Sequence, residues 1–295
     1  MEQHQARFGP AGRPESFAAM GYKRTEQLPE YLSRFGLTAF EYQCGHGLKV
    51  NRETCLRLGS LCREGGIRLS LHTPYYISLS SVEQEKREKS VRYLLESARV
   101  AELLGADRMV VHSGSCGKLS RGEALELAGD TLRRAQSALD ENGFGHIRLC
   151  PETMGKVNQL GDLAEVLALC QLEERFLPCI DFGHLNARSF GGIRGREEFA
   201  RILDKLENAL GRERARCFHG HFSRIAYTPK GGEKAHLTFA DQEYGPDHAP
   251  LMELLAERGM APTIICESAG TQAEDAAVMQ SRYRQSLAAL QQEDR

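Results

Sequence analysis

Short apolar runs alternate along the chain with longer stretches in which apolar residues recur at helical spacing. The short runs are rich in β-branched residues, which is typical of buried strands. Because longer helical patterns separate them, they predict strands joined by helical crossovers. Six runs are clear, and two weaker ones precede them: 67–72, 107–112, 147–152, 176–181, 215–221 and 262–267, after 6–9 and 38–43.

The stretches between the runs predict amphipathic helices. In residues 81–105, Val91, Leu94 and Ala98 belong to an apolar face and charged residues fill the other face. Similar patterns cover 121–141, 158–171, 196–210, 249–259 and 272–291. Eight strands alternating with helices predict an α/β fold, a (β/α)8 TIM barrel, as a single domain over residues 1–295. An open doubly wound sheet is the alternative, which the absence of a glycine-rich turn after the first strands disfavours.

Composition limits the function classes. The 295 residues are 41% hydrophobic and 26% charged, with a net charge of -2, so a nucleic-acid surface would have to be local. The nine cysteines form no CxxC pair, which favours reduced, buried thiols and a cytoplasmic protein. The N-terminus has no apolar signal segment and no run is long enough to span a membrane, so we expect no membrane partner.

Polar residues with metal-binding chemistry stand at the ends of six consecutive predicted strands. In a barrel the carboxyl ends of the strands converge on one pocket. Taken singly, a histidine there is more often hydrogen-bonded and an aspartate more often caps a turn. Taken together, buried groups of this kind need counter-charge, which divalent cations supply. The strand-end residues are His72, His112, Glu152, Asp181 with His184 just beyond, His219 with His221, and Glu267.

The number of these residues exceeds what one metal ion binds. A tetrahedral zinc takes about four ligands, and mixed histidine and carboxylate ligands suit Zn²⁺, with Mn²⁺ as an alternative. A carboxylate that bridges two ions about 3.5–4 Å apart is the usual arrangement for phosphoester hydrolysis. The sequence therefore predicts a site with more than one metal ion.

The motifs at these positions resemble those of endonuclease IV, the AP endonuclease family 2 within the xylose-isomerase-like TIM barrels. The resemblance covers about residues 6–290 and rests on HTPY (72–75), HSGS (112–115), PET (151–153), IDFGH (180–184), HFS (221–223), His236 and CES (266–268). It implies a zinc-dependent enzyme that cleaves the phosphodiester 5′ to an abasic nucleotide in DNA. We expect it to act as a monomer.

The resemblance also implies a role for each ligand. His72 and His112 would bind the first ion, and Glu152 would bridge the first and second beside the attacking hydroxide. Asp181, His221 and Glu267 would complete the second site. His184 and His236 would bind the third ion. His221 is preferred to His219 because its 15-residue spacing to His236 fits the family, and His219 would support the site from behind.

One ligand position departs from the family pattern. Where the family has an aspartate two residues before the last histidine, this chain has Lys234, and Glu233 precedes it. Three alternatives remain open: Glu233 reaches the third ion through a shifted loop, the third site is weak or empty, or the Lys234 ammonium replaces part of the cation charge. The sequence favours two ions at rest and predicts that Lys234→Asp raises occupancy of the third site.

DNA contacts are the next expectation. Tyr75 and Tyr76 follow the first histidine, where the family probes the base stack, although packing beneath a loop is an equal alternative. Arg188 and Arg224 lie in basic loops after the sixth and seventh strands and would hold phosphates. The loop CGHGLKVN (44–51) offers no arginine to penetrate the DNA.

Two other functions remain as alternatives. Glu152, Asp181, His221 and Glu267 also match the single-metal site of sugar isomerases and epimerases in related barrels. The histidines of the first site argue against that chemistry, since it does not need them, whereas Lys234 favours it. A non-catalytic barrel that binds nucleic acid or sugar is disfavoured because most metal-binding positions are intact.

Overall fold

Eight parallel strands close into a barrel in the computed structural model, which describes residues 5–45 and 47–293. They form two four-stranded sheets in the orders β1-β10-β7-β6 and β2-β3-β4-β5. Parallel bridges join Ala11 to Glu41 and Glu152 to Cys179, so that β1 adjoins β2 and β5 adjoins β6. The predicted (β/α)8 fold is confirmed. The strands are β1 (Arg7–Pro10), β2 (Ala39–Gln43), β3 (Arg68–His72), β4 (Arg108–Val111), β5 (Arg148–Pro151), β6 (Cys179–Asp181), β7 (His219–Phe222) and β10 (Thr263–Cys266).

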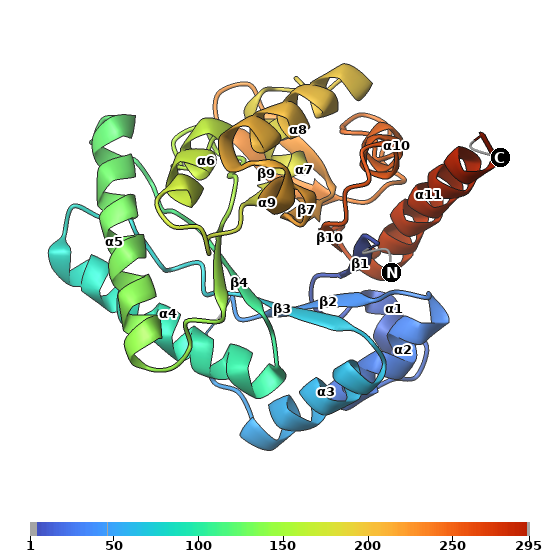
Figure 1. Cartoon of the computed structure of the whole chain (residues 1–295), viewed down its shortest axis with the longest axis horizontal. Helices are drawn as coiled ribbons and strands as arrows, with labels where there is room; N and C mark the ends of the chain where they lie inside the picture. The colour runs from blue at the N-terminus through green and yellow to red at the C-terminus, as the bar shows by residue number, and fades with distance from the viewer. Residues whose placement is uncertain (1–4, 46, 294–295) are drawn as a thin grey trace.

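Helices surround the barrel on the outside (Figure 1). The last helix, α11 (Gln272–Glu293), lies beside the first strand, β1, where the ring centroids of Phe8 and Tyr283 are 5.6 Å apart. An antiparallel hairpin of β8 (Arg224–Thr228) and β9 (Gly232–Leu237) follows β7. The helices are α1 (Glu15–Ala19), α2 (Leu28–Arg34), α3 (Arg52–Glu64), α4 (Gln84–Leu104), α5 (Arg121–Glu141), α6 (Leu163–Gln171), α7 (Phe182–Arg188), α8 (Arg196–Leu210), α9 (Arg212–Arg216), α10 (Ala249–Glu257) and α11 (Gln272–Glu293), with a 3-10 turn at Thr25–Gln27.

Capping residues determine where two of the helices begin. Ser120 and Glu123 form a capping box that starts α5 at the predicted residue. Asp162 and Glu165 form a second capping box, so α6 begins at residue 163 and not at 158 as predicted. Residues 158–162 instead form the loop that leads from β5 into this helix.

The seventh strand is shorter than predicted. Residues 215 and 216 end the short helix α9, in which the Ala215 amide donates to the Gly211 carbonyl, and β7 begins only at His219. The apolar run 215–221 therefore combines the end of a helix with the start of a strand. Neither α9, α7 nor the β8–β9 hairpin was predicted, because each is too short to show a hydrophobic period.

The interior is apolar and contains most of the thiols. All nine cysteines are free, and eight are buried. Phe8, Phe40 and Phe182 are among the largest fully buried side chains. Within residues 5–45 and 47–293, no helix is both long and apolar enough to cross a bilayer.

Candidate metal centre

The carboxyl ends of the barrel strands bring histidines and carboxylates together in three adjoining clusters. In each cluster the potential ligand atoms lie within 4.8 Å of one another. All eight residues that the sequence predicts as ligands lie in these clusters, and Glu233 joins the third cluster. The first cluster is His72, His112 and Glu152, the second is Glu152, Asp181, His221 and Glu267, and the third is His184, Glu233 and His236.

Glu152 belongs to two clusters at once. Its Oε2 lies 3.0 Å from the His112 Nε2 and 3.4 Å from the His72 Nε2. Its Oε1 lies 3.1 Å from the His221 Nδ1. The two oxygens of one carboxylate thus face different clusters, which is the geometry that a bridging ligand needs.

Asp181 combines a structural contact with a free oxygen. Its Oδ1 accepts a hydrogen bond from the His184 amide at 2.7 Å and caps the N-terminus of α7. Its Oδ2 is buried and lies 3.3 Å from the His184 Nδ1, but it accepts no hydrogen bond from the described residues. The cap and the ligand are therefore compatible interpretations of one side chain, because each uses a different oxygen.

The ionisation of these groups shows a surplus of negative charge. Burial opposes the charge on Glu152, but the neighbouring imidazoles, His221 above all, hold the pKa of its carboxyl well below its usual range. Burial also disfavours protonated His72, yet Glu152 raises the pKa of this imidazole to about 9. The pKa of His184 is likewise raised well above its ordinary value, against burial, by Asp181 and Glu152. A site that draws protons onto its imidazoles in this way also attracts cations.

The residues present fit divalent metal ions. The Oε2 of Glu152 and the Oδ2 of Asp181 are buried, and their contacts with the neighbouring imidazoles are ion pairs without a hydrogen bond among the described residues. Such oxygens are costly to bury unless something else satisfies them. Oxygen and imidazole ligands together suit zinc or manganese.

A β-bulge determines which residue completes the third cluster. In the hairpin, Ile225 pairs with His236 and Tyr227 pairs with Glu233, so Lys234 has no residue opposite it. Because paired residues point to the same face of a hairpin, His236 and Glu233 share one face. The Glu233 Oε2 lies 3.5 Å from the His184 Nε2, while Lys234 is exposed. Of the three alternatives for this position, the geometry matches the one in which Glu233 reaches the site.

A glycine lets the hairpin approach the loop after β5. The Glu233 amide donates to the Gly155 carbonyl at 3.1 Å. A Cβ at Gly155 would lie 2.6 Å from the Glu233 Cβ and 3.0 Å from the His184 Cδ2. The missing side chain at residue 155 therefore makes room for the third cluster.

Glu41 on β2 is a buried carboxylate that the sequence pattern did not indicate. Its Oε2 accepts from His219 at 2.9 Å, and its Oε1 lies 3.1 Å from the His221 Nε2. Ser70 and Gln43 also donate to this carboxylate. Glu41 thus lies behind the His221 ring, on the side away from Glu152. The regular pattern of β2 gave no signal, since one glutamate in an apolar strand is most often solvent-facing.

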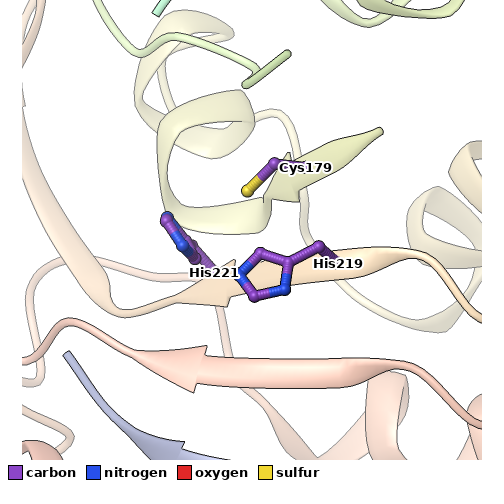
Figure 2. A group of neighbouring side chains, drawn as sticks. All are labelled: Cys179, His219 and His221. Carbon is purple, nitrogen blue, oxygen red and sulfur yellow. The ribbon is translucent and has the colours of Figure 1, made fainter. Parts of the chain in front are cut away.

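His219 on β7 contacts this carboxylate through its Nε2. Figure 2 shows its ring beside His221 on β7, with the Cys179 sulfur of β6 turned toward them. Burial lowers the pKa of His219 to about 4, even though Glu41 favours its charge, so the ring is neutral at pH 7. The structure places His219 with Cys179 and His221, outside the three clusters at the strand ends.

Two of the residues expected to contact DNA, Arg188 and Arg224, donate hydrogen bonds to loop carbonyls. Arg188 donates to the carbonyls of Met154 and residues 156, 157 and 159, which fixes the loop after β5. Arg224 donates to the carbonyls of Asp241 and Tyr244. Both guanidiniums therefore hold loops of the mouth in place.

Large aromatic side chains are exposed in the loops at the metal-binding mouth. Tyr75 and Tyr76 are 52% and 48% exposed, and the Tyr76 ring meets Tyr93 edge-on at 4.9 Å. Phe190 is 46% exposed and was missed, since one aromatic in the loop after α7 gives no pattern. Its φ of 55° lies in the left-handed region, which is uncommon for a residue with a side chain.

Comparisons with known proteins identify the family of this chain. The family model described as "Xylose isomerase-like TIM barrel" matches residues 29–292. The chain is 34% identical over 261 residues to an uncharacterised protein of Methanocaldococcus jannaschii, which covers 88% of this chain and 91% of that one. It is 32% identical over 178 residues to endonuclease 4 of Thermus thermophilus, covering 59% and 60%. The chain spans about half to three fifths of the length of the endonuclease 4 relatives it matches.

Solved structures show the same fold. The crystal structure of endonuclease IV from Thermus thermophilus superposes with a TM-score of 0.64 at 21% identity, over 96% of this chain and 99% of that one. A D-tagatose 3-epimerase-like protein superposes with a TM-score of 0.69 at 19% identity, over 98% and 100%. At such identities the likeness concerns the fold alone. The resemblance to endonuclease IV that the motifs predicted is confirmed by the sequence relatives.

Proposed function

The chain belongs to the xylose isomerase-like TIM barrel family, and on that premise we propose that it is a metal-dependent phosphodiesterase of the endonuclease IV type. Its substrate is DNA with abasic sites, which it cleaves on the 5′ side of the lesion. The observation that carries this proposal is the position of Glu152, whose two oxygens face separate ligand clusters. A one-metal enzyme has no need for the pair of histidines on the far side of this carboxylate.

The chain's own residues supply the geometry for this reaction. Bound Zn²⁺ or Mn²⁺ ions would lower the pKa of a water and offset the charge of the phosphate. Glu152 holds the first and second clusters together, and Asp181 holds its position by capping α7. Tyr75, Tyr76 and Phe190 offer exposed rings at the mouth, which suit contact with bases around a flipped nucleotide.

The third cluster is part of the proposed site. His184, Glu233 and His236 supply two imidazoles and a carboxylate within one ligand sphere. The Ser223 hydroxyl lies 2.9 Å from the His236 Nδ1 and holds that ring. We therefore favour three ions over the two that the sequence favoured, because the bulge turns Lys234 away and brings Glu233 in.

A sugar isomerase or epimerase is the second candidate. The second cluster alone offers four ligands, three carboxylates and one imidazole, which is a complete set for one ion. In this alternative the first and third clusters would not bind metal.

Metal analysis combined with an incision assay on an abasic-site duplex tests the two candidates. Wild type should hold two or three ions and incise the duplex. His112→Asn leaves the second cluster intact but should lose one ion and reduce incision by at least about a hundredfold. His146→Asn, an exposed histidine paired with Glu102, is the matched control. One ion in wild type, none lost in His112→Asn and no incision would favour the isomerase.

A further inference from the structure

A second charged mouth lies at the opposite end of the barrel. Four of the barrel strands, β1, β3, β4 and β5, begin with arginine. The cavity that opens at these amino ends has a volume of about 1170 Å³. Six arginines and only two carboxylates are among its described lining residues: Arg7, Arg68, Arg108, Arg148, Arg216 and Arg284 against Asp107 and Glu213. We call this cavity the arginine mouth.

Arg108 shows that the arginine mouth is incompletely satisfied. This residue is only 3% exposed. Its Nε and Nη2 donate to the Asp107 carboxylate at 2.8 and 3.0 Å. Its Nη1 is buried and has no hydrogen-bond partner among the described residues. A buried guanidinium N–H without a partner is costly, so this atom identifies a position where an acceptor belongs.

The remaining arginines share too little negative charge. Asp107 also lies 3.7 Å from the Arg68 Nε, so one carboxylate serves two guanidiniums. Burial lowers the pKa of Arg68, and the positive charge of Arg108 lowers it further. Within residues 5–45 and 47–293, no carboxylate forms an ion pair with Arg148 or Arg284, both of which are exposed at the rim.

We propose that the arginine mouth binds a small anion with at least two phosphate-like charges. Guanidinium groups bind phosphate oxygens in pairs, and a ring of them around a cavity fits a multiply charged ligand better than a single one. The volume suffices for a ligand as large as a nucleotide. This site is independent of the proposed nuclease activity, because it lies at the other end of the strands.

Calorimetric titration with inorganic pyrophosphate, at constant ionic strength, tests the proposal on the intact protein. Wild type should bind one pyrophosphate that the double variant Arg148→Gln/Arg284→Gln binds at least about tenfold more weakly. Both side chains are exposed, so the fold should persist, which unchanged metal content would verify. Arg133→Gln on α5, also exposed, is the matched control and should bind like wild type.

ADP in place of pyrophosphate identifies the source of the phosphate groups. If ADP binds more tightly than pyrophosphate, the cavity also contacts the nucleoside. If ADP binds more weakly, the ligand of the cavity is an inorganic polyphosphate. No saturable binding by wild type would overturn the proposal. Binding that the double variant retains unchanged would also overturn it, since the anion would then be held elsewhere, as at the metal centre.

Discussion

The two mouths of this barrel carry opposite charge on the same strands. Strand β3 begins with Arg68 and ends with His72, and the segment around β5 begins with Arg148 and leads into Glu152. At the carboxyl ends, four carboxylates lie among five imidazoles, and two buried carboxylate oxygens make ion-pair contacts with imidazoles but no hydrogen bond. At the amino ends, guanidiniums outnumber carboxylates, and a buried N–H lacks a partner.

The difference shows that unsatisfied polar atoms carry more information than charge itself. Both mouths contain ion pairs that a stable barrel tolerates. A buried atom without a hydrogen bond indicates a ligand site where it also lies in a cavity or in a cluster of metal-binding side chains. The charge of the group that carries this atom then indicates the ligand class. Carboxylate oxygens without a hydrogen bond indicate cations, and a guanidinium N–H without a hydrogen bond indicates an anion.

The largest expected effect comes from Glu152→Gln. An amide oxygen is a poor bridging ligand, and the NH₂ group would face imidazoles that need a negative partner. We expect incision of an abasic duplex to fall by about a thousandfold, together with loss of metal. Pyrophosphate binding at the arginine mouth should not change, since the two ends are separate sites. If Glu152→Gln lost pyrophosphate binding as well as incision, the two mouths would be coupled and would not be separate sites.

The pH dependence of stability should differ between chelator-treated and metal-loaded protein. The pKa of His72 is about 9 in the folded state against an unfolded value near 6.5. A raised pKa adds stability that is complete below pH 6.5 and is lost as the pH rises through about 9. In chelator, the free energy of unfolding should therefore fall by about 2–3 kcal/mol across this range.

Bound metal should reverse that slope, because ions compete with protons for the same imidazoles. Denaturant titrations at several pH values, with and without chelator, measure both slopes. His72→Asn should flatten the slope in chelator. A slope that survives in His72→Asn would have to come from other titrating groups.

The sequence predicted the barrel and the convergence of the strand-end histidines and carboxylates because both depend on local patterns. Hydrophobic runs fix the strands, and the closure of a barrel then brings His72, Asp181 and Glu267 together whatever the loops do. It could not predict Glu41 or the arginine mouth, because a single residue at a strand start has meaning only when its neighbours across the sheet are known. The sequence likewise did not reveal that loop carbonyls accept hydrogen bonds from the Arg188 guanidinium, and its contact with DNA stays a prediction.

The third cluster shows at one position why the sequence alone could not identify every residue of the site. Counting two residues back from His236 assumes a regular strand and selects Lys234. The bulge adds one residue and selects Glu233 instead. Register irregularities of this kind depend on strand pairing, which the sequence of one strand does not reveal.

A pair of neighbouring substitutions tests the bulge. Glu233→Gln should remove one ion and reduce incision by about tenfold to a hundredfold, since the third cluster loses its carboxylate. Lys234→Gln, its matched control, should change neither metal content nor incision, because this side chain is exposed. Lys234→Asp should also leave the ion count unchanged, in contrast to the expectation from sequence. A gain of one ion in Lys234→Asp would mean that the hairpin register differs from the one described.

The smallest expected effect is that of Glu41→Gln, which tests how far the metal centre extends into the barrel. Glu41 contacts no cluster oxygen, but it lies 3.1 Å from the far nitrogen of the His221 ring. A carboxylate behind a ligating imidazole fixes the ring and raises its basicity, and its loss typically weakens metal binding by about tenfold. The amide can still accept from His219, so folding should persist. Competition with a metal-sensitive chelator should show the loss at one ion only, with Glu53→Gln on the surface as control. Equal weakening of all ions would instead indicate a general loss of structure.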